Sequence, residues 1–117
     1  MSKTKFRVWD KKESQIKKEI ADYLRLKGCV VLYFRNVGIK KLDGSYIPIP
    51  SGELGVSDLI GSMPSKSGAI PFAAEIKRPG QKMTQLQKDW QSRVRLKGWR
   101  TFLWHSLDEA IKDMGVK

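Results

Sequence analysis

Residues 71–80 read PFAAEIKRPG, an apolar run that ends with Glu75 and Lys77 on either side of Ile76 and is followed at once by a turn signal. Side chains alternate between the two faces of a β-strand, so Glu75 and Lys77 point the same way and Ile76 points the other way. The continuous apolar stretch over 69–77 predicts a strand that is buried on both faces. Two interpretations of its polar end are open: an ordinary ion pair, and half of a metal-dependent phosphodiesterase site.

The residues before this strand predict a helix and two further strands. Apolar side chains recur at three- and four-residue spacing over 11–27, with Asp10 expected to cap the helix and Glu13 at its third position. Residues 29–35 are rich in β-branched and aromatic side chains and predict a strand, and residues 56–63 predict a second, short one. Between them lies a loop rich in glycine and proline, for which we expect a hairpin turn at Asp43-Gly44.

The residues after it predict a second helix, a fourth strand and a short final helix. The second helix is expected over 85–97, with Thr84 as its cap and Gln87 completing a capping box. The strand and the last helix are expected over 99–106 and 107–114. Helix, three strands, helix, strand and helix in this order predict an α/β fold.

Length and charge narrow the class of protein. The chain has 117 residues and a net charge of +11, from 23 Lys and Arg against 12 acids. We expect one domain over 1–117, with its core at about 11–112. The basic excess attracts polyanions, with nucleic acid the leading partner class and a merely basic surface the alternative.

The sequence also bears on the compartment. It has no apolar run long enough to span a membrane and no signal-peptide pattern, and Cys29 is its single cysteine. A cytoplasmic compartment is therefore expected.

Asp58 is the second acid in an apolar context, within GVSDLIG. An unpaired buried charge is costly, so Asp58 needs a partner or a metal ion. If its strand is the neighbour of 70–77, Asp58 and Glu75 come side by side, and two carboxylates repel each other unless a cation lies between them. Mg²⁺ or Mn²⁺ accepts such oxygen ligands, and the carbonyl of Ile76 is a natural addition. The ammonium of Lys77 would orient a water molecule and offset charge on a phosphorane.

Asp58 followed by EIK at 75–77 has the spacing of the PD-(D/E)XK nuclease signature. Further segments extend the pattern in order: ESQIKKEIADYLRLKG at 13–28, RNVG at 35–38, GVSDLIG at 55–61, AEIKRPGQKMTQLQ at 74–87 and GWRTFLW at 98–104. Together they resemble the virus-type replication-repair nuclease (VRR-NUC) branch of that superfamily, over residues 13–110. The resemblance implies a stand-alone nuclease domain of the phage or bacterial type. Its fold would be a restriction-endonuclease-like αβββαβ core with a mixed central sheet flanked by helices.

The resemblance also implies roles for individual residues. The catalytic set would be two strand carboxylates, a lysine, an acid on the first helix and a glutamine on the later one: Asp58, Glu75, Lys77, Glu13 and Gln87. The ligands of Mg²⁺ or Mn²⁺ would be three carboxylates and one carbonyl: Asp58, Glu75, Glu13 and Ile76. Glu13 and Gln87 have the alternative of serving only as helix-capping residues. Ser57 departs from the pattern, which has proline there.

Two loops carry basic residues that we expect to hold a phosphate backbone. The expected contacts are Arg35, Asn36, Lys40, Lys41, Arg78 and Lys82. Backbone contacts position DNA without reading its bases, so we expect structure-selective cutting.

These features predict a metal-dependent DNA endonuclease that cuts branched DNA, such as four-way junctions or flaps. The resemblance implies a homodimer, and SYIPIP at 45–50 is one candidate surface for it. The alternative is a non-catalytic, basic nucleic-acid-binding module that keeps the nuclease fold. His105 is the single histidine and Cys29 the single cysteine, so a zinc site is not expected.

Overall fold

The structure, a computed structural model, describes residues 12–33, 38–40, 42–43, 46–48 and 55–114. Its elements are α1 (Glu13–Leu26), β1 (Val30–Tyr33), β2 (Gly38–Lys40), β3 (Tyr46–Pro48), β4 (Leu59–Met63), β5 (Ile70–Ile76), α2 (Gln85–Arg95), β6 (Arg100–Trp104) and α3 (Leu107–Met114). The predicted order is confirmed. β2 and β3 pair antiparallel on either side of the turn that the sequence predicted, of which Asp43 is described.

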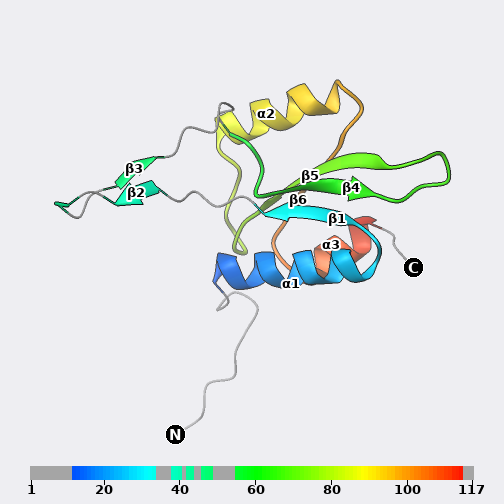
Figure 1. Ribbon diagram of the computed structural model, residues 1–117, viewed down its shortest axis with the longest axis horizontal. Helices are drawn as coiled ribbons and strands as arrows, with labels where there is room; N and C mark the ends of the chain where they lie inside the picture. The colour runs from blue at the N-terminus through cyan, green and yellow to red at the C-terminus, as the bar shows by residue number, and fades with distance from the viewer. Residues whose placement is uncertain (1–11, 34–37, 41, 44–45, 49–54, 115–117) are drawn as a thin grey trace, which may run out of the picture.

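The main sheet has the strand order β1-β4-β5-β6. β1 pairs antiparallel with β4 and β4 with β5, whereas β5 and β6 run parallel. The parallel pair is joined through α2, which is the crossover that such a pair requires. The predicted αβββαβ core with a mixed sheet is therefore confirmed, with α1 and α3 on one side of the sheet and α2 on the other (Figure 1).

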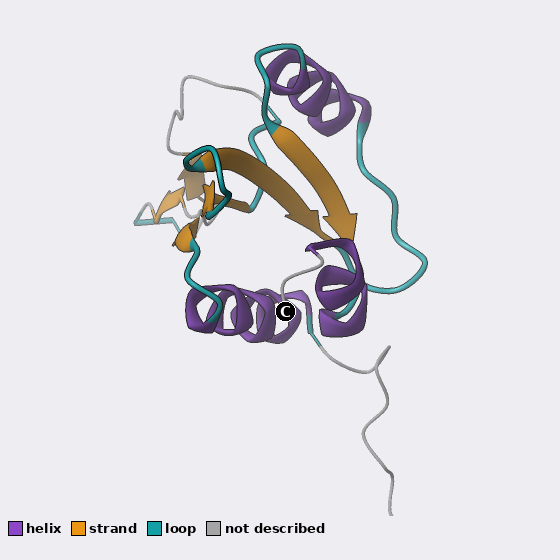
Figure 2. Cartoon of the chain, turned by 90° about the vertical axis from the view of Figure 1, so that its right-hand side faces the viewer, coloured by secondary structure: helices purple, strands orange, loops and turns teal. Residues whose placement is uncertain are grey.

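β5 is one of the two inner strands of the main sheet and is buried as the sequence predicted. Every residue from Phe72 to Ile76 is buried, including Glu75. The ring of Phe102 on β6 stacks on Trp104 with centroids 4.8 Å apart, and packs edge-on against Phe72 at 6.5 Å. Figure 2 shows β5 and β6 between the helices of the two layers. The end of β5 is thus held rigidly from both sides.

α1 covers the sheet with its apolar stripe, in which Ile16, Ile20 and Leu24 are buried. Its start differs from the prediction. The helix begins at Glu13, so Asp10, outside the described residues, is not its cap. The Lys12 backbone N–H instead donates to Oε1 of Gln15, the third helical residue, at 2.9 Å. Gln15 thus takes the part at the third helical position that Glu13 was expected to take, and the helix begins at Glu13, two residues later than predicted. Neither α1 nor the other helices of the described residues combine the length and the apolar composition that a membrane span requires.

The strand predicted over 56–63 is shorter than expected. β4 starts at Leu59, and Asp58 occupies a bend before it. The carboxylate of Asp58 accepts a hydrogen bond from the backbone N–H of Ile76 on β5. This side-chain hydrogen bond stands where a backbone carbonyl of a longer β4 would otherwise pair with β5. Cys29 is buried as expected, and burial raises the pKa of its thiol.

Gly61 marks the closest approach of β4 to β1. A Cβ at this position would collide with the carbonyl group of Val30 and lie 3.1 Å from the ring of Phe72. We expect Gly61→Ala to lower the free energy of unfolding by about 3 kcal/mol, because neither neighbour can move without disturbing the sheet. Urea denaturation measures the change. Ser62→Ala, at the next residue of the same strand, is the control and should cost less than about 1 kcal/mol. Equal stability of the two variants would contradict the observed strand register.

Candidate active site

A cleft of about 870 Å³ lies beside the end of β5, between α1 and the start of α2. Its walls include all five side chains that the sequence predicted as a catalytic set: Glu13, Asp58, Glu75, Lys77 and Gln87. Residues separated by up to 74 positions in the sequence therefore share one cavity.

Asp58 lies opposite Glu75 because of the strand register. Leu59 pairs with Ala74 across the antiparallel β4 and β5, so the next pair outward is Asp58 with Glu75. Oδ2 of Asp58 accepts the backbone N–H of Ile76 at 2.9 Å, which fixes the orientation of the carboxylate. Its Oδ1 accepts a hydrogen bond from Nζ of Lys17 on α1 at 3.2 Å. The predicted adjacency of the two acids is observed, and Lys17 is an addition to the predicted set.

The carboxyl group of Glu75 is almost fully buried, with 2% of the residue exposed. Its Oε2 accepts a hydrogen bond from Nε2 of Gln87 at 3.0 Å, while Oε1 is buried and has no hydrogen-bond partner within the described residues. Burial, and after it the charge of Asp58, raises the pKa of Glu75 from 4.5 to about 9; the charges of Lys77 and Lys17 act in the opposite direction. The group is therefore neutral near pH 7 until a cation favours its ionised form.

Gln87 forms the predicted capping box and also contacts Glu75, while its catalytic role stays a prediction. Its backbone N–H donates to Oγ1 of Thr84 at 3.2 Å, and its Oε1 accepts the backbone N–H of Thr84 at 2.8 Å. This is the predicted capping box at the start of α2. The remaining amide group, Nε2, reaches Glu75. One side chain thus starts the helix and holds the buried carboxyl group.

Ser57 stands where the nuclease pattern has proline, and the structure gives it a partner. It is fully buried, and Oγ accepts a hydrogen bond from Nε2 of Gln91 at 3.2 Å. The same amide group donates to the carbonyl oxygen of Phe102 at 2.9 Å. Gln91 therefore ties the segment before Asp58 to β6.

Sequence reasoning missed Gln91 and Lys17. Each lies four residues after a predicted site residue on the same helix, Gln91 after Gln87 and Lys17 after Glu13. Residues at this spacing share a helix face, and that was the available signal.

The two carboxyl groups suit a hard divalent ion. They lie opposite each other, and one oxygen of Glu75 is buried without a partner, which an ion would satisfy. Mg²⁺ binds readily through one or two carboxylates with water in its other positions. Among the described residues, no three His, Cys, Asp or Glu side chains form a cluster suited to a metal ion. Glu13 lines the same cleft but does not form a three-residue cluster with Asp58 and Glu75. Its role as a direct ligand stays a prediction.

The expected phosphate contacts are only partly described. Arg78 and Lys82 are exposed in the loop after β5, and Lys40 belongs to β2. Arg35, Asn36 and Lys41 lie outside the described residues. These roles stay predictions.

His105 holds the loop that follows the site. Its Nε2 lies 2.9 Å from the carbonyl oxygen of Gln81, and its Nδ1 lies 3.1 Å from Oε1 of Glu109 on α3. Both ring nitrogens of His105 therefore contact other groups of the protein, and the ring links the loop at Gln81 to α3.

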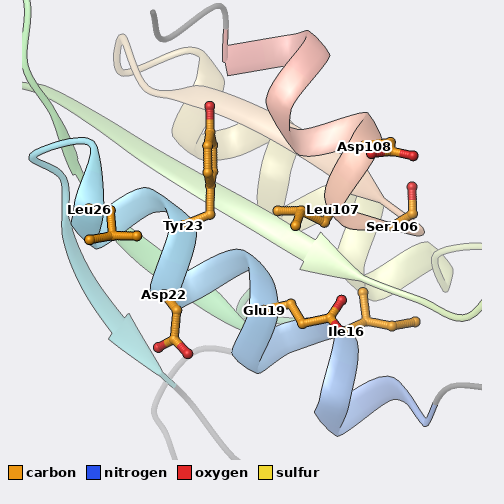
Figure 3. Close-up of a pocket in the computed structure, with 8 residues that line it drawn as sticks. All are labelled: Ile16, Glu19, Asp22, Tyr23, Leu26, Ser106, Leu107 and Asp108. Carbon is orange, nitrogen blue, oxygen red and sulfur yellow. The ribbon is translucent and has the colours of Figure 1, made fainter.

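A second groove, of about 520 Å³, lies between α1 and the start of α3 (Figure 3). Apolar side chains such as Ile16, Tyr23 and Leu107 line it, together with the acids Glu19 and Asp108. Negative charge disfavours a phosphate backbone there. None of the predicted site residues lines this groove, so the candidate active site is the cleft at the end of β5.

No protein-family model and no curated protein sequence matches the chain. Among solved structures, one described as a "VRR_NUC domain" superposes with a TM-score of 0.61 at 19% sequence identity. The match covers 88% of this chain and 94% of that one. The chain therefore has the fold of a VRR_NUC domain, which confirms the fold that the sequence resemblance implied.

The raised pKa of Glu75 predicts a pH-dependent stability in the absence of metal. Its protonated form is favoured by folding, so its contribution to stability is complete below about pH 4.5 and is lost as the pH rises toward about 9. We expect the free energy of unfolding to fall by up to about 1.4 kcal/mol per pH unit between these limits.

Glu75→Gln removes this titration and should flatten the profile. Urea denaturation in EDTA at a series of pH values compares the two proteins. Parallel profiles for the variant and the wild type would show that Glu75 is not the titrating group.

Proposed function

We propose that this protein is a metal-dependent deoxyribonuclease of VRR-NUC type, which hydrolyses phosphodiester bonds at the Asp58–Glu75 site. The observation that carries the proposal is the buried, unpartnered oxygen of Glu75 opposite Asp58. A protein that had no use for this arrangement would gain stability by replacing either acid. The similarity of the fold to a VRR_NUC domain supports the same conclusion.

Asp58 and Glu75 would hold the ion, with the carbonyl oxygen of Ile76 and the carboxylate of Glu13 as further ligands. Mg²⁺ or Mn²⁺ supplies a Lewis acid for the phosphoryl oxygen and lowers the pKa of a bound water molecule. The chain contributes the orientation of the ligands. Asp58 is held by the N–H of Ile76, and Glu75 by the amide of Gln87. Glu75 would have to lose its proton to serve as a ligand.

Lys77 is the proposed catalytic lysine. It lines the cleft, and its charge lowers the pKa of Glu75, so its ammonium group acts on the site itself. In that position it orients the attacking water and stabilises negative charge that develops on the phosphoryl oxygens. Its backbone N–H donates to the carbonyl oxygen of Trp104 at 3.0 Å, which anchors the residue to the parallel strand β6.

DNA is the proposed substrate. The net charge of +11 suits a polyanion, and the cleft continues along α1 as far as Arg25. Contacts of this kind hold the backbone without reading bases, so cutting depends on DNA structure. A homodimer with two such sites would suit four-way junctions or flaps.

A non-catalytic nucleic-acid-binding module is the second candidate. The contact between Lys17 and Asp58 favours it, because this contact neutralises one of the two acids without a metal ion. The two candidates differ in whether DNA is cut.

Lys77→Ala should lower the rate of DNA cleavage in Mg²⁺ or Mn²⁺ by about 10²-fold or more, because the variant lacks the positioned ammonium group. Cleavage by the wild type should disappear in EDTA. Lys66→Ala, in the exposed turn between β4 and β5, is the matched control and should keep wild-type activity. Salt-sensitive DNA binding without cleavage in any metal would favour the module. Full activity of Asp58→Ala would leave the enzyme class intact and overturn the proposed site.

Four-way junctions and flaps should be cut about tenfold faster than linear duplexes of the same sequence, because two linked sites act on one branched molecule. Cleavage of a matched substrate panel measures the preference, and light scattering of the protein measures its oligomeric state. Cutting at one fixed sequence in random linear duplexes would contradict structure-selective cleavage.

A further inference from the structure

Lys17 is a cation that the structure places inside the candidate active site. It lies on α1, one helical turn after Glu13, and its Nζ is 3.2 Å from Oδ1 of Asp58. Both side chains are only 15% exposed. The contact joins residues 41 positions apart in the sequence, so it links α1 to the start of β4.

The neighbouring lysine shows what an ordinary surface pair looks like on the same helix. Lys18 contacts Asp22 at 2.7 Å, and these side chains are 72% and 52% exposed. Such exposed pairs contribute little. The ammonium group of Lys17 is instead drawn largely out of water, a loss of hydration that its contact with Asp58 offsets. The Lys17 contact is therefore shielded inside the cleft, whereas the Lys18 contact lies at its exposed edge.

The contact also occupies an oxygen that a metal ion would need. Oδ2 of Asp58 accepts the N–H of Ile76, and Oδ1 accepts the ammonium of Lys17. A divalent ion that approaches Asp58 therefore meets a resident positive charge within a few ångströms of its own position. Two cations so close together in a shielded cleft repel each other strongly.

We propose that Lys17 is the resident counter-ion of Asp58, and that it sets the affinity of the site for a divalent ion by competing with that ion for the carboxylate. This inference rests on the proposed function. When an ion binds, the ammonium group leaves Oδ1 and remains within the cleft, where a phosphate group of DNA is the anion available to it. Lys17 is thus a positioning residue that links loading of the ion to binding of the substrate.

The test measures Mn²⁺ binding to the whole chain without DNA, by isothermal titration calorimetry. Lys17→Met should bind Mn²⁺ about tenfold more tightly than the wild type, because the competing charge is gone. Lys18→Met removes the same charge one residue away and should bind within about twofold of the wild type, since that charge is exposed and screened. Lys17→Arg keeps the charge and should restore wild-type affinity.

A stability measurement separates this role from a purely structural one. Without metal, Lys17→Met should melt below Lys18→Met, because Asp58 has lost its partner. Saturating Mn²⁺ should then raise its melting temperature by more than it raises that of the wild type. Lys17→Gln keeps a hydrogen-bond donor without the charge and gives the same comparison if Lys17→Met does not fold.

The outcomes distinguish this inference from the function on which it rests. If the wild type binds neither Mn²⁺ nor Mg²⁺, the proposed function and the role of Lys17 both fail. The wild type could instead bind Mn²⁺ while Lys17→Met and Lys17→Gln bind it equally or more weakly. In that case Lys17 is a structural residue, and only this inference is overturned.

Discussion

The burial of the Glu75 carboxyl group is the constraint on which the rest of the site depends. Glu75 lies at the end of β5, an inner strand that β4 and β6 flank on both sides. A carboxyl group there is poorly solvated, so each neighbouring polar side chain has a strong effect on it. Gln87 satisfies one of its oxygens, and Lys77 and Lys17 favour its charged form. Asp58 opposes that charge, and a divalent ion would relieve the conflict.

The site is built at the expense of the stability of the metal-free protein. A buried oxygen without a partner and two facing carboxyl groups are both unfavourable. The apolar core beneath them, with Phe72, Ile76 and Trp104, supplies the stabilisation that allows the arrangement to persist. Binding of an ion at the proposed site would add stability by mass action, because the folded state alone presents the paired acids.

Two helices hold the site from opposite sides of the sheet. α1 reaches Asp58 through Lys17, and α2 reaches Glu75 through Gln87. α2 also holds the segment before Asp58, through the contact of Gln91 with Ser57. The acids are thus positioned by segments that meet only in the folded chain, and a shift of either helix would alter the electrostatics of the cleft.

The sequence by itself determined the order of elements, the burial of β5, the adjacency of Asp58 and Glu75, and the capping box of Gln87. These follow from local periodicity, turn residues and antiparallel pairing of consecutive strands, all of which act over short stretches of chain. The starts of α1 and β4 were predicted wrongly, because hydrogen bonds of the Gln15 and Asp58 side chains replaced the expected local pattern. Only the tertiary structure decided that Lys17 contacts Asp58 and that Gln91 contacts Ser57, since these partners are 41 and 34 residues away. A lysine on a helix has the same local pattern whether it faces solvent or a buried carboxylate, and packing of the helix against the sheet makes that choice.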